Sequence, residues 1–504
     1  MSRSMGDIRE NHRDAIEEAT QDLTVDHWID GESVASANGE RFETSDPAID
    51  EPIVDVAQGT ESEIDDAVEA AEAALRSWKE TTPRERDDII REWTSTLRDH
   101  LDELALLESL DTGKPLAYAR DEAKEAFNYL EYYVSVAQAH EGSELPVGPD
   151  NHAYVRQEPF GVAGQILPWN YPLQLFGWKA GAALAAGNVV VLKPSEESPM
   201  TATRVAQLSK GILPDGVLNI VNGFGEEAGQ PLTNHDAIDK LSFTGSVPVG
   251  KQVMSAAAEG IKPVTLELGG KSPFVVFPDA DLEQAAETSA AGIFYNTGQS
   301  CDACTRILVH EDAHDEFLDL YLEEATETWQ PGDPLEDGTT MGPLTFDDQY
   351  EKVSNYVEIG EEEGANLVVG GGDPDGEEFE DGWFFEPTVF DDVDNDMRIA
   401  QEEIFGPVQS IITFSSYEEA IEIANGVSYG LAAGVATNDA SIAHHAAADI
   451  LAGSVWVNEY HGDGPGVPFG GFKESGIGRE CAKETLDEYT QSKTVNLKLD
   501  EPEL

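Results

Sequence analysis

Hydrophobic residues recur at helical spacing in two stretches near the start of the chain. The first, residues 62–79, predicts an amphipathic helix from the spacing of Ile64, Val68, Ala71 and Leu75. Pro83 opens the second, because a proline in the first helical turn sacrifices no hydrogen bond. Its apolar stripe consists of Ile89, Ile90, Trp93, Leu97, Leu101 and Leu104. Residues 1–24 are polar, and we expect them to form a mobile N-terminal segment.

From residue 162 onward, short apolar runs alternate with helical segments. Buried strands are predicted at 189–192, 217–221, 240–243 and 263–268. Strands that alternate with helices indicate a parallel sheet in a doubly wound α/β domain, which binds ligands at the carboxyl ends of its strands. A second α/β stretch follows from residue 272 to about 470. The alternating segment 489–499 predicts a terminal strand, which must pair with a sheet edge or with another subunit.

The charge of the chain changes the range of partners that we expect. Among 504 residues there are 99 acidic and 30 basic side chains, which gives a net charge of −69. This surface would repel a phosphate backbone, so we expect no nucleic-acid partner. The apolar patterning argues against disorder. We interpret the acidity as an adaptation to a very salty cytoplasm, where ions screen the self-repulsion of the surface.

The number of cysteines and the lengths of the apolar runs predict where in the cell the protein is located. The three cysteines, Cys301, Cys304 and Cys481, are too few for a disulfide scaffold and fit a reducing environment. The N-terminus lacks the apolar core of a signal peptide. The most apolar run, residues 180–192, is short and interrupted by Gly187 and Asn188, so we expect no membrane span. We therefore predict a soluble cytoplasmic protein.

Cys301 is the leading candidate for a nucleophile. It follows Asn296, Gly298 and Gln299, and small or amide residues suit a crowded site with backbone donors nearby. A thiolate is a strong nucleophile where its surroundings lower its pKa. A buried structural cysteine is the alternative interpretation. A third hypothesis is a zinc or dithiol site formed by Cys301 and Cys304, although a structural zinc would need two more ligands and we predict no metal.

Two further residues suit acid–base and oxyanion chemistry. Glu267 ends a predicted strand just before two glycines, a position that would face a cleft. Asn170 lies in a loop stiffened by Pro168 and Pro172, which would fix its amide as an oxyanion donor. The alternative readings are a loop carboxylate and a loop asparagine that satisfies its own backbone.

The cofactor signals are weak when each is taken alone. Gly223, Gly225 and Gly229 form a G-x-G-x-x-x-G pattern, one residue longer than the dinucleotide fingerprint. Lys193 and Glu196 follow a buried strand and could bind ribose hydroxyls, with Glu196 opposing a 2′-phosphate. A surface turn with a local ion pair is the alternative interpretation.

Taken together, the motifs resemble those of the aldehyde dehydrogenase superfamily in their order along the chain, from about residue 25 to 498. They are Pro168-Trp-Asn170, Lys193-Pro-Ser-Glu196, Phe243-Thr-Gly-Ser246, Leu266-Glu-Leu-Gly-Gly-Lys-Ser-Pro273, Gly298-Gln-Ser-Cys301, Glu402-Glu-Ile-Phe-Gly-Pro407, Trp456-Val-Asn458 and Pro468-Phe-Gly-Gly-Phe-Lys-Glu-Ser-Gly476. The resemblance implies NAD(P)-dependent oxidation of an aldehyde to the acid. Cys301 would be the nucleophile, Glu267 the base that activates water, and Asn170 with the Cys301 N–H the oxyanion hole.

The resemblance also implies the cofactor contacts, with NAD as the expected cofactor and NADP as an alternative. Lys193 and Glu196 would hold the adenosine ribose, Trp169 and Ser246 the pyrophosphate, and Glu403 and Phe405 the nicotinamide ribose and ring. The full set is Ile166, Trp169, Lys193, Ser195, Glu196, Gly225, Gly245, Ser246, Leu268, Glu403 and Phe405.

The family fold implies a Rossmann-type cofactor domain, an α/β catalytic domain and a small β oligomerisation element. These would take residues 25–145 with 164–270, residues 271–470, and residues 146–163 with 471–504. The last element implies a homodimer or homotetramer, which agrees with the unpaired terminal strand.

The identity of the aldehyde is left open by the sequence. We expect the pocket walls to include Tyr171, Trp178, Tyr295, Tyr460 and Phe469. Aromatic side chains suit an apolar aldehyde or a quaternary ammonium, so betaine aldehyde, semialdehydes and sugar-derived aldehydes all stay candidates. Two rival hypotheses are a catalytically silent relative and a thiol redox or metal-binding protein. Cys304 could also pair with Cys301 on oxidation and switch the enzyme off.

Overall fold

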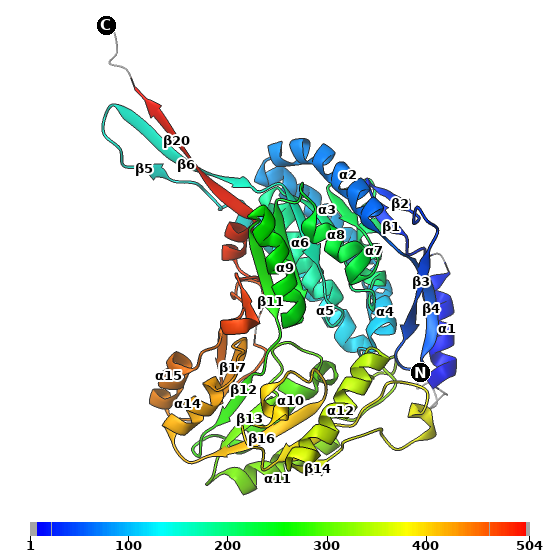
Figure 1. Cartoon of the computed structure of the whole chain (residues 1–504), viewed down its shortest axis with the longest axis vertical. Coiled ribbons are helices and arrows are strands. Elements are labelled where there is room, and N and C mark those ends of the chain that lie inside the picture. Colours follow the sequence, from blue (N-terminus) through cyan, green and yellow to red (C-terminus); the bar gives the residue numbers. More distant parts are fainter. Residues whose placement is uncertain (1–7, 22, 463, 500–504) are drawn as a thin grey trace.

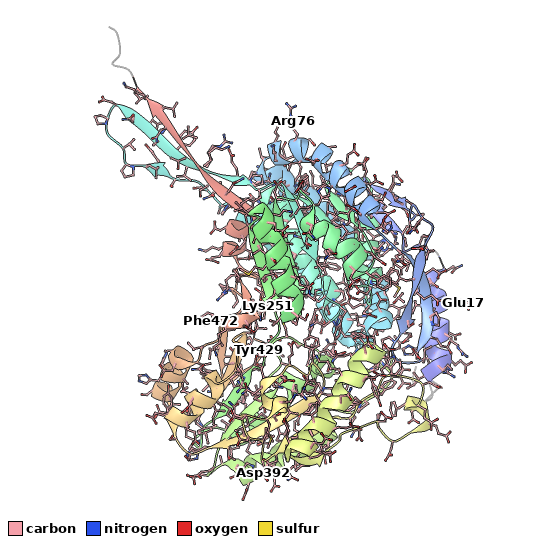
Figure 2. All side chains as sticks on the ribbon, viewed as in Figure 1. Glu17, Arg76, Lys251, Asp392, Tyr429 and Phe472 are labelled. Atoms are coloured by element: carbon pink, nitrogen blue, oxygen red, sulfur yellow. The ribbon has the colours of Figure 1, made fainter. Side chains whose placement is uncertain are left out.

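In a computed structural model, the chain is described over residues 8–21, 23–462 and 464–499. These residues form two α/β bodies, each built on its own sheet, and a narrow antiparallel sheet that projects from one of them (Figure 1). Side chains fill the space between the layers, and Glu17, Arg76 and Asp392 project from the outer surface (Figure 2). Within the described ranges, no helix has both the length and the apolar composition needed to cross a bilayer.

The first body contains an eight-stranded sheet. Its strands are, in spatial order, β19 (Gly476–Ile477), β11 (Val264–Leu268), β10 (Lys240–Gly245), β7 (Val162–Ile166), β8 (Val189–Lys193), β9 (Leu218–Ile220), β1 (His27–Ile29) and β2 (Glu32–Val34). The five strands from β11 to β9 run parallel, and the strands at both ends are antiparallel. Every residue of β8 is buried, as expected for a strand covered on both faces. The predicted parallel sheet and its four predicted strands are therefore confirmed.

Helices pack against this sheet and bury its apolar residues. They are α2 (Glu61–Glu80), α3 (Pro83–Asp99), α4 (Leu101–Thr112), α5 (Leu116–Ala137), α6 (Pro172–Ala186), α7 (Met200–Gln207), α8 (Gln230–Asn234) and α9 (Val247–Gly260). The first predicted helix is confirmed as α2, where Thr60 and Glu63 form a reciprocal capping box. The second predicted helix is two helices, because His100 leaves helical geometry between α3 and α4.

The second body contains a seven-stranded sheet. Its strands are, in spatial order, β14 (Asn366–Val369), β15 (Thr388–Asp391), β16 (Val408–Phe414), β13 (Arg306–His310), β12 (Pro273–Val276), β17 (Ala432–Ala436) and β18 (Ser454–Val457). All neighbours are parallel except the edge pair β14 and β15. The helices of this body are α10 (Leu282–Phe294), α11 (His314–Glu327), α12 (Asp347–Glu363), α13 (Arg398–Gln401), α14 (Tyr417–Asn425) and α15 (Ala440–Asp449).

The predicted terminal strand is β20 (Thr490–Lys498), and it pairs within its own chain. It runs antiparallel to β6 (Asn151–Pro159) along the whole length of both strands, and β6 in turn pairs with β5 (Glu144–Leu145). The expected β element is thus narrower than residues 471–504, because β19 joins the large sheet by pairing with β11.

The N-terminal segment differs from the expectation of a mobile tail. Residues 1–7 and 22 lie outside the described residues, but Ile8–Thr20 form helix α1, which packs beside the hairpin of β3 (Arg41–Asp46) and β4 (Glu51–Ala57). His12 on α1 is fully buried between Asp46 and Asp333. The mobile-tail prediction is wrong for this helix, because a buried ionic contact holds it in place.

Candidate active site

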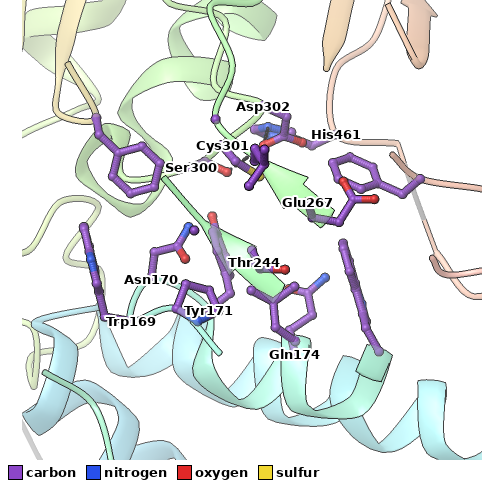
Figure 3. A pocket seen from close by; sticks show the side chains of 18 of the residues that line it. Trp169, Asn170, Tyr171, Gln174, Thr244, Glu267, Ser300, Cys301, Asp302 and His461 are labelled. Atoms are coloured by element: carbon purple, nitrogen blue, oxygen red, sulfur yellow. Dashed lines mark hydrogen bonds and ion pairs between the residues drawn. The ribbon is translucent and has the colours of Figure 1, made fainter. Parts of the chain in front are cut away.

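A cavity of about 580 Å³ lies where the carboxyl ends of β10 and β11 meet the second body. It brings together residues that the sequence scatters over some 350 positions, from Glu125 to Cys481. Most of the predicted site residues line it: Cys301, Glu267, Asn170, Trp169, Gly245, Ser246, Leu268, Glu403, Phe405, Tyr171, Trp178, Tyr295, Tyr460 and Phe469. Figure 3 shows Cys301 on one side of this space and Asn170 on the other.

A tight turn delivers Cys301 to the cavity. The turn Tyr295–Gly298 follows α10, and Asn296 and Thr297 adopt left-handed φ values of 52° and 57°. Such values are costly for residues with a Cβ and cluster at functional sites. Gly298 is required there, because a Cβ would lie 2.1 Å from the carbonyl oxygen of Gly406. Packing therefore fixes the backbone just before the thiol.

The surroundings of Cys301 hold its thiol protonated. Burial raises the pKa of Cys301 well above its ordinary value, and the nearby carboxyl groups of Asp302, Glu267 and Glu403 raise it further. The predicted thiolate nucleophile would need neighbours that lower this pKa. Among the described residues, the ionisable neighbours that shift it are instead carboxyl groups, so the side chains around the thiol do not by themselves favour the thiolate.

Asn170 is held so that its amide faces the cavity from a rigid loop. Its Nδ2 donates to the carbonyl oxygen of Gln299 at 3.0 Å, two residues before Cys301. Its own carbonyl accepts from Lys114 Nζ at 3.0 Å and from Asn296 Nδ2 at 3.2 Å. The second hydrogen of Nδ2 is left for a ligand beside the thiol. Backbone and side chain are thus tied to the same segment that carries Cys301.

Glu267 ends β11 in a dry environment. Its side chain is buried, and neither carboxyl oxygen has a hydrogen-bond partner among the described residues. Burial raises the pKa of Glu267 well above its ordinary value, and the charge of Glu480 raises it further, while Lys179 and Arg479 act in the opposite direction. Lys179 Nζ lies 2.7 Å from Glu480 Oε1. A raised pKa is what a carboxyl group needs to take a proton near neutral pH.

The predicted ribose ligands lie at the carboxyl end of β8 and are not among the residues that line the cavity. Lys193 Nζ lies 3.0 Å from Glu196 Oε2, just beyond β8. The side chains of Ile166 and Lys193 both lie within 4 Å of where a Cβ on Gly229 would stand. Gly225 begins a short π-helical turn and has open space around it. The Ser195 hydroxyl accepts a hydrogen bond from the Glu197 N–H at 3.3 Å, which stabilises the local turn.

The cavity itself also contains predicted cofactor residues, which lie next to the predicted catalytic residues. Ser246 precedes the first turn of α9, whose free N–H groups suit a pyrophosphate. The rings of Trp169 and Phe405 meet edge to face at 5.2 Å. Glu403 accepts a hydrogen bond from the Gly270 N–H at 3.0 Å, and a Cβ on Gly269 would collide with its carboxylate. Because Gly269 and Gly270 have no side chains, the Glu403 carboxylate can approach the backbone at these two residues.

The rival readings of the cysteines find no support in the geometry. Cys304 is fully buried and donates a hydrogen bond to the Ser289 carbonyl, and burial raises the pKa of its thiol. All three cysteines lie in the described residues, and none of them forms a disulfide bond there. In the part of the chain that the structure describes, no three histidine, cysteine, aspartate or glutamate side chains gather as a metal site.

Comparison with known proteins identifies the family. The model of the aldehyde dehydrogenase family matches residues 34–495. The chain belongs to the aldehyde dehydrogenase family. It is 45% identical over 473 residues to aldehyde dehydrogenase 1 of Tanacetum cinerariifolium, covering 93% of this chain and 94% of that protein. Aldehyde dehydrogenase of Aspergillus niger is 43% identical over 475 residues, covering 94% and 95%.

Solved structures of aldehyde dehydrogenases share the fold over nearly the whole chain. The NAD+ complex of the enzyme from Bacillus cereus superimposes with a TM-score of 0.93 at 44% identity, covering 96% of this chain and 98% of that one. Betaine aldehyde dehydrogenase of Staphylococcus aureus in complex with NAD+ has a TM-score of 0.94 at 37% identity and covers 97% of both chains. These matches confirm the predicted fold class.

This aldehyde dehydrogenase also contains cavity residues that the sequence analysis missed. The missed lining residues with polar side chains are Glu125, Gln174, Thr244, Ser300, Asp302, Gln349, Lys352 and His461. Behind the lining lie the buried Lys179–Glu480 pair beside Glu267, and Lys114 behind Asn170. Local signals existed for three of them, because Thr244 and Ser300 stand inside two of the motifs and Asp302 directly follows Cys301 in the chain.

Proposed function

We propose that this aldehyde dehydrogenase oxidises a small aldehyde to the carboxylic acid, with Cys301 as nucleophile and Glu267 as base. The observation that carries the proposal is that one cavity is lined by Cys301, Asn170 and Glu267 and is continuous with Ser246, Glu403 and Phe405. A thiol redox protein or a metal-binding protein would not require these residues to line one cavity.

The predicted cofactor residues fit NAD, which is bound in the two similar structures described above. The N-terminus of α9 offers backbone donors for a pyrophosphate. Glu196 offers an acceptor for ribose hydroxyls and is held by Lys193 Nζ, which also donates to the carbonyls of Pro194 and Gly223. Glu196 would oppose the 2′-phosphate of NADP, so we expect a preference for NAD. When bound, NAD supplies the acceptor for the hydride that leaves the aldehyde carbon.

The residues of the chain carry the remaining chemistry. The Cys301 thiol first loses its proton to the solvent. The resulting thiolate attacks the aldehyde carbon, and the oxygen that becomes negative is held by Asn170 Nδ2 and by the Cys301 N–H. Each such donor contributes roughly 3–4 kcal/mol in comparable oxyanion holes. After loss of the hydride, the acyl group is bound to Cys301 as a thioester. Glu267 takes a proton from water, which attacks the thioester and releases the acid and the thiol.

Kinetic measurements of NADH formation test this scheme. Wild-type protein, Cys301→Ala and Glu267→Gln are compared over a panel of aldehydes in concentrated KCl. We expect no turnover from Cys301→Ala. Glu267→Gln should give a burst of about one NADH per site followed by slow steady turnover, because acylation proceeds and hydrolysis does not. Turnover by Cys301→Ala would refute the nucleophile. A silent relative would bind NAD without reducing it with any aldehyde.

We further propose that the sheet of β5, β6 and β20 mediates a homodimer or homotetramer in a salty cytoplasm. Support comes from the way this sheet extends away from the body (Figure 1), with most residues of β20 exposed. Such an edge would need a partner to be covered. Light scattering of the purified protein in concentrated KCl should give a dimer or tetramer mass, and a monomer mass at micromolar concentration would contradict the proposal.

A further inference from the structure

A second acidic residue stands beside the nucleophile. Asp302 follows Cys301 directly and lines the same cavity, with 12% of its side chain exposed. Its backbone carbonyl accepts a hydrogen bond from the Tyr460 hydroxyl at 2.6 Å, and its Oδ1 accepts one from the Ser300 hydroxyl at 2.6 Å. His461 Nε2 lies 3.3 Å from the same Oδ1. Backbone and carboxylate are therefore fixed relative to the thiol.

The carboxylate of Asp302 is charged although it is nearly buried. Burial acts to raise its pKa, but the charge of His461 and the hydrogen bonds of His461 and Ser300 outweigh burial and hold the pKa below its ordinary value. This negative charge raises the pKa of the neighbouring Cys301 thiol. Even with His461 beside it, the charge of Asp302 opposes formation of the Cys301 thiolate.

The rest of the cavity also favours a positive ligand. Besides Asp302, the carboxyl side chains of Glu125, Glu267 and Glu403 line it, and burial raises the pKa of Glu267 and Glu403 but does not outweigh the partners that hold the pKa of Asp302 low. Among the described lining residues, Lys352 and His461 are its basic groups, and Lys352 lies near Glu403 at the cofactor end. The walls near the thiol are aromatic: Tyr171, Trp178, Tyr295, Tyr460 and Phe469. Aromatic faces attract ammonium and quaternary ammonium groups.

We propose that Asp302 is a specificity-determining residue that selects aldehydes bearing a cationic nitrogen a few bonds from the carbonyl. Figure 3 shows Asp302 and Cys301 together on one side of the pocket, facing Tyr171 and Gln174 across the space for the substrate. Both residues line the same cavity, and the charge of Asp302 acts on the Cys301 thiol. The cation would pair with Asp302, lie against the aromatic walls and offset the charge that hinders the thiolate. This inference rests on the proposed function.

Two aldehydes of the same shape distinguish the effect of substrate charge on kcat/KM from the effect of substrate size. Betaine aldehyde carries a trimethylammonium group, and 3,3-dimethylbutanal is its neutral carbon analogue. For wild-type protein, kcat/KM should be about tenfold or more higher for the cation, a difference typical of desolvated cation pairing. Asp302→Asn keeps the shape and the Ser300 hydrogen bond. It should lower kcat/KM for the cation about tenfold but not lower it for the neutral aldehyde, because loss of the charge also eases formation of the Cys301 thiolate.

Matched variants and inhibitors keep the test decisive. Glu125→Gln removes another cavity carboxylate and should change the preference less than Asp302→Asn does. If Asp302→Asn loses all activity, Asp302→Glu must keep the cation preference, or the proposal is wrong. Choline should inhibit wild-type protein more tightly than its neutral analogue 3,3-dimethylbutanol. Equal rates for both aldehydes in wild type, or a preference that Asp302→Asn leaves unchanged, would overturn the proposal. Absence of NADH from any aldehyde would instead refute the proposed function.

Discussion

Replacing His12 by alanine should loosen helix α1 in a pH-dependent way. Nδ1 of His12 lies 2.5 Å from Asp46 Oδ2, and Nε2 lies 3.0 Å from Asp333 Oδ1. Burial acts to lower the pKa of His12, but the hydrogen bonds and charges of Asp333 and Asp46 outweigh it and raise the pKa to about 9. At neutral pH the imidazolium therefore joins α1 to β3 and to the segment before α12.

The size of this contribution follows from the pKa. One pKa unit corresponds to about 1.4 kcal/mol, so the rise from 6.5 to about 9 stabilises the docked helix by roughly 3 kcal/mol. Because the folded-state pKa lies above the unfolded value, this stability is fully present below pH 6.5. It is lost as the pH rises through about 9. The pH window is set by His12 itself and not by the ordinary titration of the surface.

Amide hydrogen exchange of residues 8–20 measures this effect directly. Wild type and His12→Ala are compared at about pH 6 and about pH 9.5, with exchange rates corrected for the intrinsic effect of pH. The exposed His444→Ala on α15 is the control and should match wild type. The opening free energy of α1 should fall by roughly 3 kcal/mol in His12→Ala at the lower pH, and by less than half of that at the higher pH. An equal loss at both values would refute the ionic link.

Four further changes test other parts of the structure. Lys114→Met should lower the unfolding free energy by roughly 3–5 kcal/mol in denaturant titrations, because it leaves Glu108 and Glu122 buried without a counter-charge. Glu196→Gln should raise kcat/KM for NADP relative to NAD about tenfold, since it removes the charge that opposes a 2′-phosphate. Cys304→Ser should leave inactivation by peroxide unchanged, because this thiol is fully buried. Removing KCl should lower Tm, and a salt-independent Tm would contradict the adaptation to salt.

Much of the fold was predictable because its central strands are buried on both faces. Such strands are continuous apolar runs whatever surrounds them, and β8 is buried along its whole length. Helix α1 was not predictable in the same way. Its sequence is polar, and the helix is held by the side-chain contacts of His12 with Asp46 and Asp333. Both aspartates are distant from His12 in the chain. No local pattern marks a contact of that kind.

The candidate site divides in the same way. Cys301, Glu267 and Asn170 could be found because each stands in a recognisable motif next to a strand end or a rigid loop. The neighbouring groups that shift the pKa of these residues could not be found from the sequence. The pair of Lys179 and Glu480 joins α6 to a loop some 300 residues later, and its importance comes from burial beside Glu267, not from its sequence. Sequence motifs located the residues that we propose to react, whereas their electrostatic environment required the fold.

That environment implies an order of use for the two reacting groups. Burial raises the pKa of both Cys301 and Glu267, and the charge of Glu267 raises the pKa of Cys301 further. Because the interaction between two charges is mutual, a Cys301 thiolate equally disfavours ionisation of Glu267. The cavity therefore does not hold both anions at once. In the proposed reaction the conflict resolves itself, because acylation converts Cys301 into an uncharged thioester. Glu267 is then released from this repulsion and can ionise to serve as the base, at the step where water must be activated.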